Sequence, residues 1–235
     1  MLRKLLFFVS LIVGFFVLGA TKNSLIQFNL VVTYFDKQDR INEFHRCFQE
    51  NVRNKYIKKI YVLYEDFQGN APWFLLHDKI KIIKLDHYPE HKDFYDFINK
   101  NLSGELVIWA NTDIYFDDTL KSLRHVDFHN GIAILTRYNI PEYQGKWKRH
   151  PNSHDAWIFK APIRYLNGNF KINRFINENI MLDEWIKSGY RVTNPSLTVK
   201  AWHVHREDYR AHDVLCEYAS MKVPFYSIPF TTLPD

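Results

Sequence analysis

Asp113 is the residue whose type and position most clearly suggest chemistry. It follows an apolar run in the stretch ELVIWANTDIYFDDTL, residues 105–120. Ligands of open α/β sheets collect at the carboxyl ends of strands, and a carboxylate there can hold Mg²⁺ or Mn²⁺, which can bind a diphosphate. A helix-capping role is the alternative, but Asp117 and Asp118 already precede Thr119–Leu123. The pattern therefore favours Asp113 as a metal ligand.

A second ligand could come from His203 and His205, which are separated by one residue. Positions i and i+2 of a strand point to the same face, so both imidazoles can lie on one side. A lone histidine is usually a surface or core residue, but this pair accompanies a metal-type aspartate. Neutral imidazole suits Mn²⁺ better than Mg²⁺, so we expect Mn²⁺, with Mg²⁺ as the alternative.

Asp155 and Glu178 are the two carboxylates that could act as a general base, which takes a proton from an attacking hydroxyl. Asp155 lies in the segment SHDAW, residues 153–157. If this segment is extended, Asp155 shares a face with Trp157, a ring that could stack on a sugar. The simpler interpretations are a turn-forming aspartate and a glutamate favoured by the helix dipole in a first helical turn.

The elements that must position these residues alternate between strands and helices in the first half of the chain. Apolar, β-branched runs predict strands, and apolar residues at helical spacing predict helices. Such alternation predicts an α/β fold with a mostly parallel central sheet flanked by helices on both faces. The predicted strands are 26–35, 58–66, 79–87 and 105–110, and the predicted helices cover 41–52 and 93–102.

The second half is less regular. Gly131–Thr136 and Trp157–Lys160 are expected to be strands, and Ile176–Ser188 a helix that ends at Gly189. Residues 191–205 are expected to form a strand pair broken at Pro195. The pattern indicates a nucleotide-binding α/β fold, which several activities share.

The stretch around Asp113 resembles the DxD region of GT-A-fold glycosyltransferases, in the AN-x-D-I-x-F form of some viral, algal and bacterial members. The resemblance covers most of residues 28–210, and the amino-terminal transferase domain of a large chlorovirus protein is similar. It implies a GT-A-like (Rossmann-like) fold and transfer of a sugar from a nucleotide-sugar donor to a glycan or other hydroxyl acceptor. Inversion is expected, because the sequence shows no second nucleophile-like carboxylate beside the acceptor site. The similar segments are Thr33-Tyr34-Phe35 with Arg40 and Glu43, Lys59–Glu65, Ser153–Trp157, Asn194-Pro195-Ser196 and His203-Val204-His205.

The chain departs from the family motif at its first aspartate, which is Asn111 here. An amide cannot supply charge to a metal, so Asn111 is expected to hydrogen-bond a ribose or sugar hydroxyl, and Asp113 remains the carboxylate ligand. The resemblance favours His203 over His205 as the further ligand.

By the same resemblance, Glu178 is the expected base, while Asp155 and Trp157 bind the acceptor. Thr33 and Tyr34 are expected where the base of the nucleotide lies. Arg40 could pair with phosphate or with Glu43. The donor site is completed by Lys92, the weakest of these candidates.

Charge and cysteine content exclude other classes. The net charge is +5, but Lys and Arg are mixed with Asp and Glu, with no basic run beyond Lys55–Lys59, so nucleic acid is not an expected partner. Cys47 and Cys216 are the only cysteines, which excludes a disulfide framework and a cysteine-based zinc site.

Residues 1–24 are expected to be a signal anchor or signal peptide, and 25–235 one transferase domain. Arg3 and Lys4 precede an uncharged apolar run over 5–20, shorter than the roughly 20 residues of a typical span, so cleavage competes with anchoring. We favour the anchor. The positive residues keep the amino terminus cytosolic, which predicts a single-pass type II protein facing the lumen of the endoplasmic reticulum or Golgi, secreted if the leader is cleaved.

Two other functions are compatible with these residues. A metal-dependent hydrolase of sugar-phosphate or phosphodiester bonds could use Asp113, Asp155, His203 and His205. A membrane-tethered carbohydrate-binding module could use the many Trp and Tyr rings without turnover.

Overall fold

The structure is a computed structural model, and it describes residues 25–65, 69–140, 153–172, 177–205, 224 and 226–234. The expected leader, residues 1–24, lies outside the described residues. Within the described part of the chain, no helix is long and apolar enough to cross a membrane.

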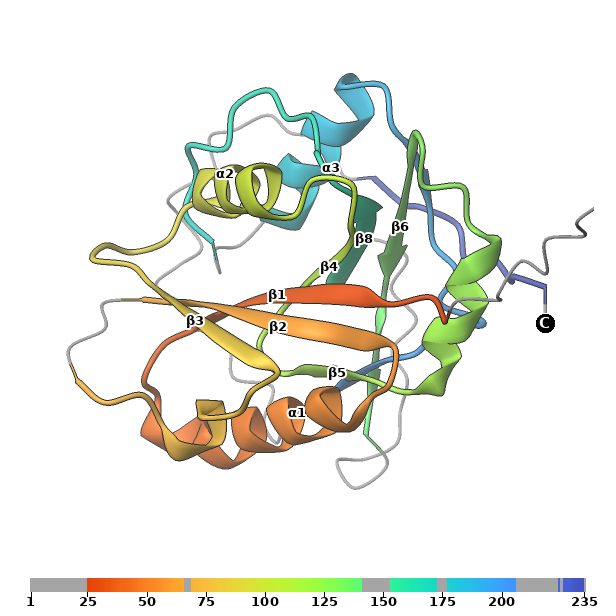
Figure 1. Cartoon of the computed structure of the whole chain (residues 1–235). Helices are drawn as coiled ribbons and strands as arrows, with labels where there is room; N and C mark the ends of the chain where they lie inside the picture. The colour runs from red at the N-terminus through yellow and green to blue at the C-terminus, as the bar shows by residue number, and fades with distance from the viewer. Residues whose placement is uncertain are drawn as a thin grey trace, which may run out of the picture.

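A seven-stranded sheet forms the centre of the fold (Figure 1). Only β8 runs against its neighbours, β4 and β6, and the other pairs are parallel. The predicted mostly parallel sheet is therefore confirmed. In spatial order, its strands are β3 (Ile80–Lys84), β2 (Ile57–Tyr64), β1 (Phe28–Tyr34), β4 (Leu106–Ala110), β8 (Ala156–Lys160), β6 (Gly131–Leu135) and β9 (Arg191–Thr193).

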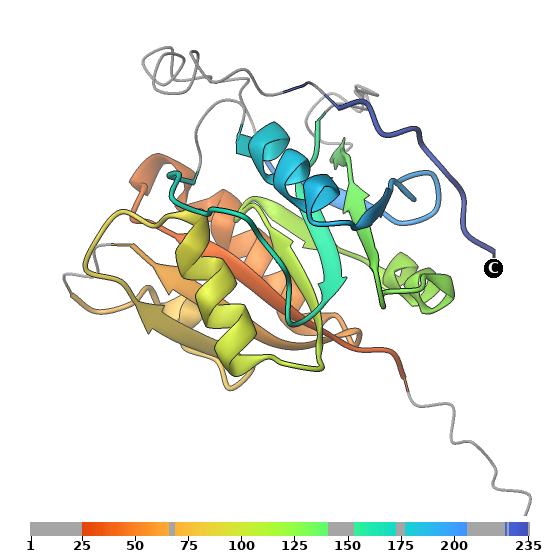
Figure 2. The same cartoon turned by 90° about the horizontal axis from the view of Figure 1, so that it is seen from above.

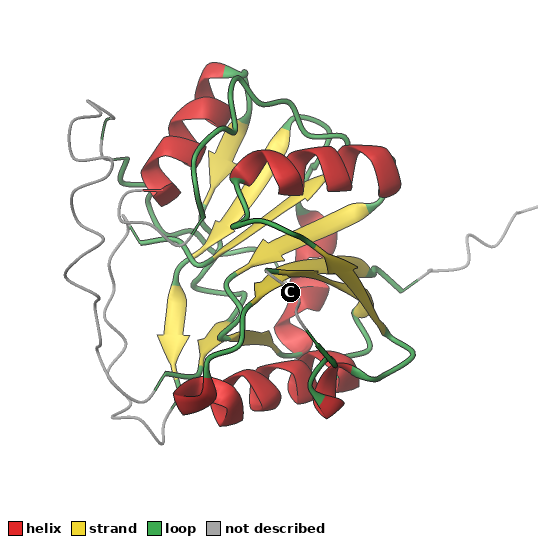
Figure 3. Ribbon diagram, turned by 90° about the vertical axis from the view of Figure 1, so that its left-hand side faces the viewer, coloured by secondary structure: helices red, strands yellow, loops and turns green. Residues whose placement is uncertain are grey.

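Helices cover both faces of this sheet, as predicted. The helix α1 (Ile41–Arg53) lies on one face, while α2 (His91–Asn101) and α3 (Asn177–Lys187) lie on the other (Figures 1 and 2). Figure 3, coloured by secondary structure, shows the same sandwiching of the strands.

Strand β1 explains why two cores form. All seven of its side chains are buried, and successive side chains point to opposite faces. Leu30 and Val32 pack in the cluster that includes Phe44 and Phe48 of α1. Val31 packs in the other cluster, with residues of α2 and α3. An apolar run without polar alternation is what a strand buried on both faces requires.

A second, three-stranded sheet stands beside the first and consists of β5 (Ile114–Phe116), β10 (Ala201–His203) and β7 (Arg137–Asn139), in that order. Strand β10 is antiparallel to β5 and parallel to β7. Two strands form within 191–205, but the prediction that they pair with each other is wrong, because β9 joins the large sheet and β10 joins the small one. The small sheet brings His203 opposite Ile114, next to Asp113.

Two helices show the local rules clearly. Helix α2 begins with a capping box in which Glu90 and Asp93 satisfy each other's backbone N–H groups. Helix α3 is followed by Gly189 with φ of 85°, the left-handed conformation that glycine adopts after a helix end.

The expected helix at Thr119–Leu123 is a 3-10 helix, η3, over Asp118–His125, and Asp117 caps it by accepting from the Thr119 N–H.

Candidate metal and catalytic site

Asp113, His203 and His205 meet at one place. Their potential ligand atoms all lie within 4.8 Å of one another, and Nε2 of His203 is 3.2 Å from Oδ2 of Asp113. The backbone N–H of Val204 also donates to the Asp113 carbonyl at 2.9 Å, which fixes the segment that carries both histidines against the turn between β4 and β5. The three predicted metal candidates are therefore brought together.

The donor set fits a divalent ion. Nδ1 of His203 lies 3.2 Å from Oδ1 of Asn139, and if that amide oxygen accepts the Nδ1 proton, the lone pair of Nε2 faces the Asp113 carboxylate. Two electron-rich groups face each other stably only with a cation or a proton between them. Burial, followed by the charge of Arg40, lowers the pKa of His205, which favours the neutral form that binds metal. One carboxylate and two imidazoles suit Mn²⁺.

Arg40 is a cationic neighbour of Asp113. Its Nη2 lies 2.8 Å from Oδ2 of Asp113, and its Nε lies 2.7 Å from Oε2 of Glu43. Burial alone would raise the pKa of Asp113, but His203 and Arg40 outweigh burial and hold that pKa well below its ordinary value. Asp113 is therefore ionised at any physiological pH. Arg40 was expected to pair with phosphate or with Glu43. In the structure it contacts Glu43 and, in addition, Asp113.

Asp155 lies in a closed network. Its side chain is only 1% exposed, and Oδ1 accepts from Nη1 of Arg137 at 3.1 Å and from the Asn111 amide at 3.4 Å. Its Oδ2 accepts from the backbone N–H of Arg137 at 3.3 Å. Asp155 was expected to bind the acceptor, and in the structure its enclosed side chain contacts Arg137 and Asn111.

Arg137 is a site residue that the sequence interpretation missed. It opens β7 directly after the strand predicted at Gly131–Thr136, so a cation at a strand end was the available indication. Both Asp113 and Glu178 act electrostatically on its guanidinium, which stays about one-third exposed. A cation held in that position can bind an anionic ligand.

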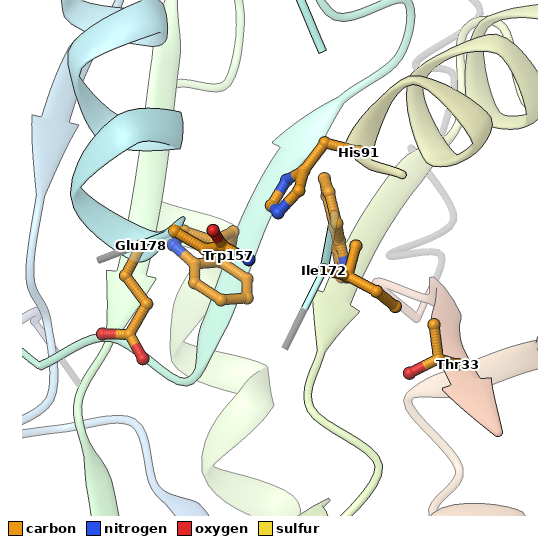
Figure 4. A pocket seen from close by; sticks show the side chains of 7 residues that line it. Thr33, His91, Trp157, Ile172 and Glu178 are labelled. Carbon is orange, nitrogen blue, oxygen red and sulfur yellow. The ribbon is translucent and has the colours of Figure 1, made fainter. Parts of the chain in front are cut away.

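Glu178 lies at the start of α3, where its Oε2 accepts the backbone N–H of His154 at 2.9 Å. It lines a pocket together with Trp157 (Figure 4). The predicted pairing of a carboxylate with Trp157 is thus made by Glu178. The other lining residues are Thr33, His91, Trp109, Ile172 and Asn177.

The expected donor residues occupy different environments. Thr33 lines the pocket, and its carbonyl accepts the Thr112 hydroxyl at 2.6 Å. Tyr34 is 1% exposed, with its ring packed edge-on against Tyr64 in the core, so that ring cannot stack on a nucleotide base. Lys92 is exposed on α2 and is not among the residues that line the pocket.

No family model and no curated protein matches this chain by sequence. Among solved structures, the mannosyltransferase PcManGT from Pyrobaculum calidifontis, in complex with GDP-Man and Mn²⁺, is similar with a TM-score of 0.52 and 10% identity. The match covers 76% of this chain and 56% of that chain, so this chain spans little more than half of that protein's length.

Two further structures show weaker likeness. The inositol-1-phosphate CTP transferase from T. maritima has a TM-score of 0.46 and 9% identity, over 76% of this chain and 89% of its own. The glycosyltransferase GlyE of Streptococcus pneumoniae TIGR4 has a TM-score of 0.35 and 14% identity, over 58% and 34%.

The fold is therefore GT-A-like, the α/β architecture that this chain has in common with the mannosyltransferase. The narrower likeness to a chlorovirus protein stays a prediction.

Proposed function

We propose that this protein is a metal-dependent glycosyltransferase that moves a sugar from a nucleotide-sugar donor to a hydroxyl acceptor, with inversion. The observation that carries the proposal is the cluster of Asp113, His203 and His205 at the carboxyl end of the central parallel strands. Ligand sites of open α/β sheets lie at that edge. Fold alone would not distinguish a transferase from other nucleotide-binding enzymes.

Asp113, His203 and His205 are the residues that would hold the ion, for which Mn²⁺ is favoured over Mg²⁺. Bound there, the ion supplies Lewis-acid stabilisation of a leaving diphosphate. That the similar mannosyltransferase was solved with GDP-Man and Mn²⁺ supports this assignment.

The protein's own cations contribute next to the ion. Asp155 holds the Arg137 guanidinium through one contact, from Nη1 at 3.1 Å, and holds the Arg137 backbone N–H through a second at 3.3 Å. We assign this guanidinium to the diphosphate, because arginine binds phosphate oxygens in a fixed geometry. Arg40 balances the charge of Asp113 when no ion is bound, and with the ion in place it can turn to phosphate.

Glu178 is our candidate base. It belongs to the pocket, whereas Asp155 is enclosed. In the proposed step, Glu178 takes the proton of the acceptor hydroxyl while that oxygen bonds to the anomeric carbon. The bond from that carbon to the phosphate oxygen breaks, and its electron pair leaves with the diphosphate. Among the described residues that line the pocket, Glu178 is the only carboxylate, which favours a single displacement with inversion.

The hydrolase alternative lacks one of its expected metal-binding residues at this site. It required Asp155 beside the metal candidates, but the cluster found among the described residues contains only Asp113 and the two histidines. The carbohydrate-binding alternative gives no role to an ionised Asp113 between His203 and Arg40.

Calorimetric titration with nucleoside diphosphates, with and without Mn²⁺, tests the proposal. A transferase should bind one of them tightly and only with the metal. Sugar binding without any diphosphate binding would favour the carbohydrate-binding module, and release of phosphate from a donor in the absence of acceptor would favour the hydrolase.

The place of action is part of the proposal. The leader composition favours a single-pass type II protein that faces the endoplasmic reticulum or Golgi lumen. Nucleotide sugars are expected in that lumen, so a donor-dependent enzyme could work there.

A further inference from the structure

Three polar atoms around the pocket of Glu178 are buried and have no hydrogen-bond partner among the described residues: Nδ1 of His91, Nε1 of Trp157 and Oδ1 of Asn177. Their residues are at least nine-tenths buried, with relative exposures of 4%, 4% and 5%. Figure 4 shows the His91 ring and the Trp157 ring facing the same space, with Glu178 on one side and Thr33 on the other. Buried polar atoms are nearly always hydrogen-bonded, so three at one pocket indicate a site that a polar ligand completes.

The rings are held in place by neighbouring aromatic side chains. The His91 imidazole stacks on Phe170 with ring centroids 4.1 Å apart. The Trp157 ring contacts Trp109, its cross-strand neighbour, at 5.8 Å. A pocket with rigid aromatic walls and a few fixed polar atoms is typical of a small-molecule site.

The charge of the pocket limits the ligand. Burial lowers the pKa of His91 to about 3, so its imidazole is neutral. The only charged group among the described lining residues is Glu178, which is anionic. Among the described lining residues, a carboxylate-bearing sugar would meet no cation and one carboxylate, that of Glu178. The cavity volume of about 60 Å³ admits the hydroxyl-bearing edge of one sugar ring but no nucleotide.

We propose that His91, Trp157 and Asn177 form a subsite that binds the hydroxyl groups of an uncharged sugar beside Glu178 and rejects uronic and sialic acids. The inference rests on the proposed transferase function and specifies the class of sugar that the transferase binds. The indole N–H donates to a hydroxyl oxygen, the Asn177 oxygen accepts a hydroxyl proton, and His91 can do either. Trp157 was already expected to bind the acceptor, whereas His91 and Asn177 are specificity-determining residues that the sequence did not reveal.

The test compares wild type with His91→Phe and Trp157→Phe, which keep a ring but remove the nitrogen. Trp185→Phe is the matched control, because Nε1 of Trp185 is also buried without a partner but Trp185 does not line the pocket. Calorimetry with Mn²⁺ would measure GDP, GDP-mannose, UDP, UDP-glucose and UDP-glucuronate. Saturation-transfer NMR would measure methyl α-mannoside and methyl β-glucoside. Circular dichroism and melting temperature would verify each fold.

If the subsite holds the donor sugar, both variants should lower the affinity for the preferred neutral nucleotide sugar by roughly tenfold each, with affinity for the free diphosphate unchanged. If it holds the acceptor sugar, only methyl glycoside binding should fall. In wild type, UDP-glucuronate should bind no better than UDP.

The proposal is overturned if neither sugar readout changes in folded variants, if Trp185→Phe causes the same loss, or if UDP-glucuronate gains affinity over UDP. Failure of every diphosphate to bind with Mn²⁺ would instead reject the transferase function, and the methyl glycosides would still report on the pocket.

Discussion

Nε2 of His203 lies 3.2 Å from Oδ2 of Asp113, although 90 residues separate them in the chain. The same Oδ2 also accepts from Nη2 of Arg40 at 2.8 Å. Asp113 is thus the meeting point of three distant segments. This relationship is the basis of the first two predictions.

Asp113→Asn should abolish Mn²⁺-dependent donor binding and leave the fold intact, because the amide is nearly isosteric but carries no charge. Calorimetry with Mn²⁺ and the preferred nucleoside diphosphate would measure the loss. Glu43→Gln is the control, since Glu43 contacts Arg40 but is not in the metal cluster. Unchanged metal-dependent affinity in Asp113→Asn would remove the basis of the proposed function.

Asn139→Leu should weaken Mn²⁺ binding by roughly 10- to 100-fold, the usual effect of losing a group that orients a metal-bound histidine. The Asn139 oxygen is 3.2 Å from Nδ1 of His203, where it can accept the Nδ1 proton and leave Nε2 for the metal. Electron paramagnetic resonance of free Mn²⁺ would follow binding. An affinity equal to wild type, in a folded variant, would mean that His203 is oriented in another way or is not a ligand.

Glu178→Gln should reduce turnover by roughly 10²–10⁴-fold while donor affinity is preserved, since only the proton acceptor is lost. Steady-state kinetics and donor titration together separate these quantities. A proportional loss of donor affinity would instead show that Glu178 binds the donor.

Asp155→Asn should mainly affect the architecture of the site. Removing the charge of a buried carboxylate that accepts hydrogen bonds from Arg137 is expected to cost about 1–3 kcal/mol in the free energy of unfolding, and donor affinity should fall as Arg137 loses its anchor. Urea denaturation and donor titration would measure both. If stability and donor affinity are unchanged while turnover falls as predicted for Glu178→Gln, the two carboxylates have exchanged roles.

Membrane orientation can be tested through Asn101, an exposed residue at the end of α2 in the sequon Asn101-Leu102-Ser103. Expressed in eukaryotic cells, the domain should resist protease added outside sealed microsomes. A glycan on Asn101 would give a mobility shift that Asn101→Gln removes. Digestion of the domain in intact microsomes would show that it faces the cytosol.

The sequence predicted the parts of the site that depend on local pattern. Asp113 follows an apolar run, and His203 and His205 are separated by one residue at the end of a predicted strand, so these positions could be read from short windows. The buried position of Asp155 could not be predicted from a short window, because burial of a carboxylate depends on which cation the fold brings to it. Arg137, 18 residues earlier in the chain, is brought to Asp155 only by the folded sheets.

His91 was missed for a related reason. A histidine at the first turn of a helix has no distinctive spacing, and its role depends on the opposing Trp157 of β8. The prediction of a strand pair over 191–205 was wrong because the strand pattern of a sequence does not specify which sheet a strand joins. Partner choice is set by long-range packing.

Strand β10 is hydrogen-bonded along both edges, by β5 and by β7. A strand enclosed in this way cannot move along its neighbours one residue at a time, and such a slip would turn Trp202 toward Asp113 and His203 away from it. The presence of the site is thus decided by strand register as well as by residue type. An insertion of one residue within Ala201–His203 would therefore destroy the cluster while every one of its side chains remained in the chain.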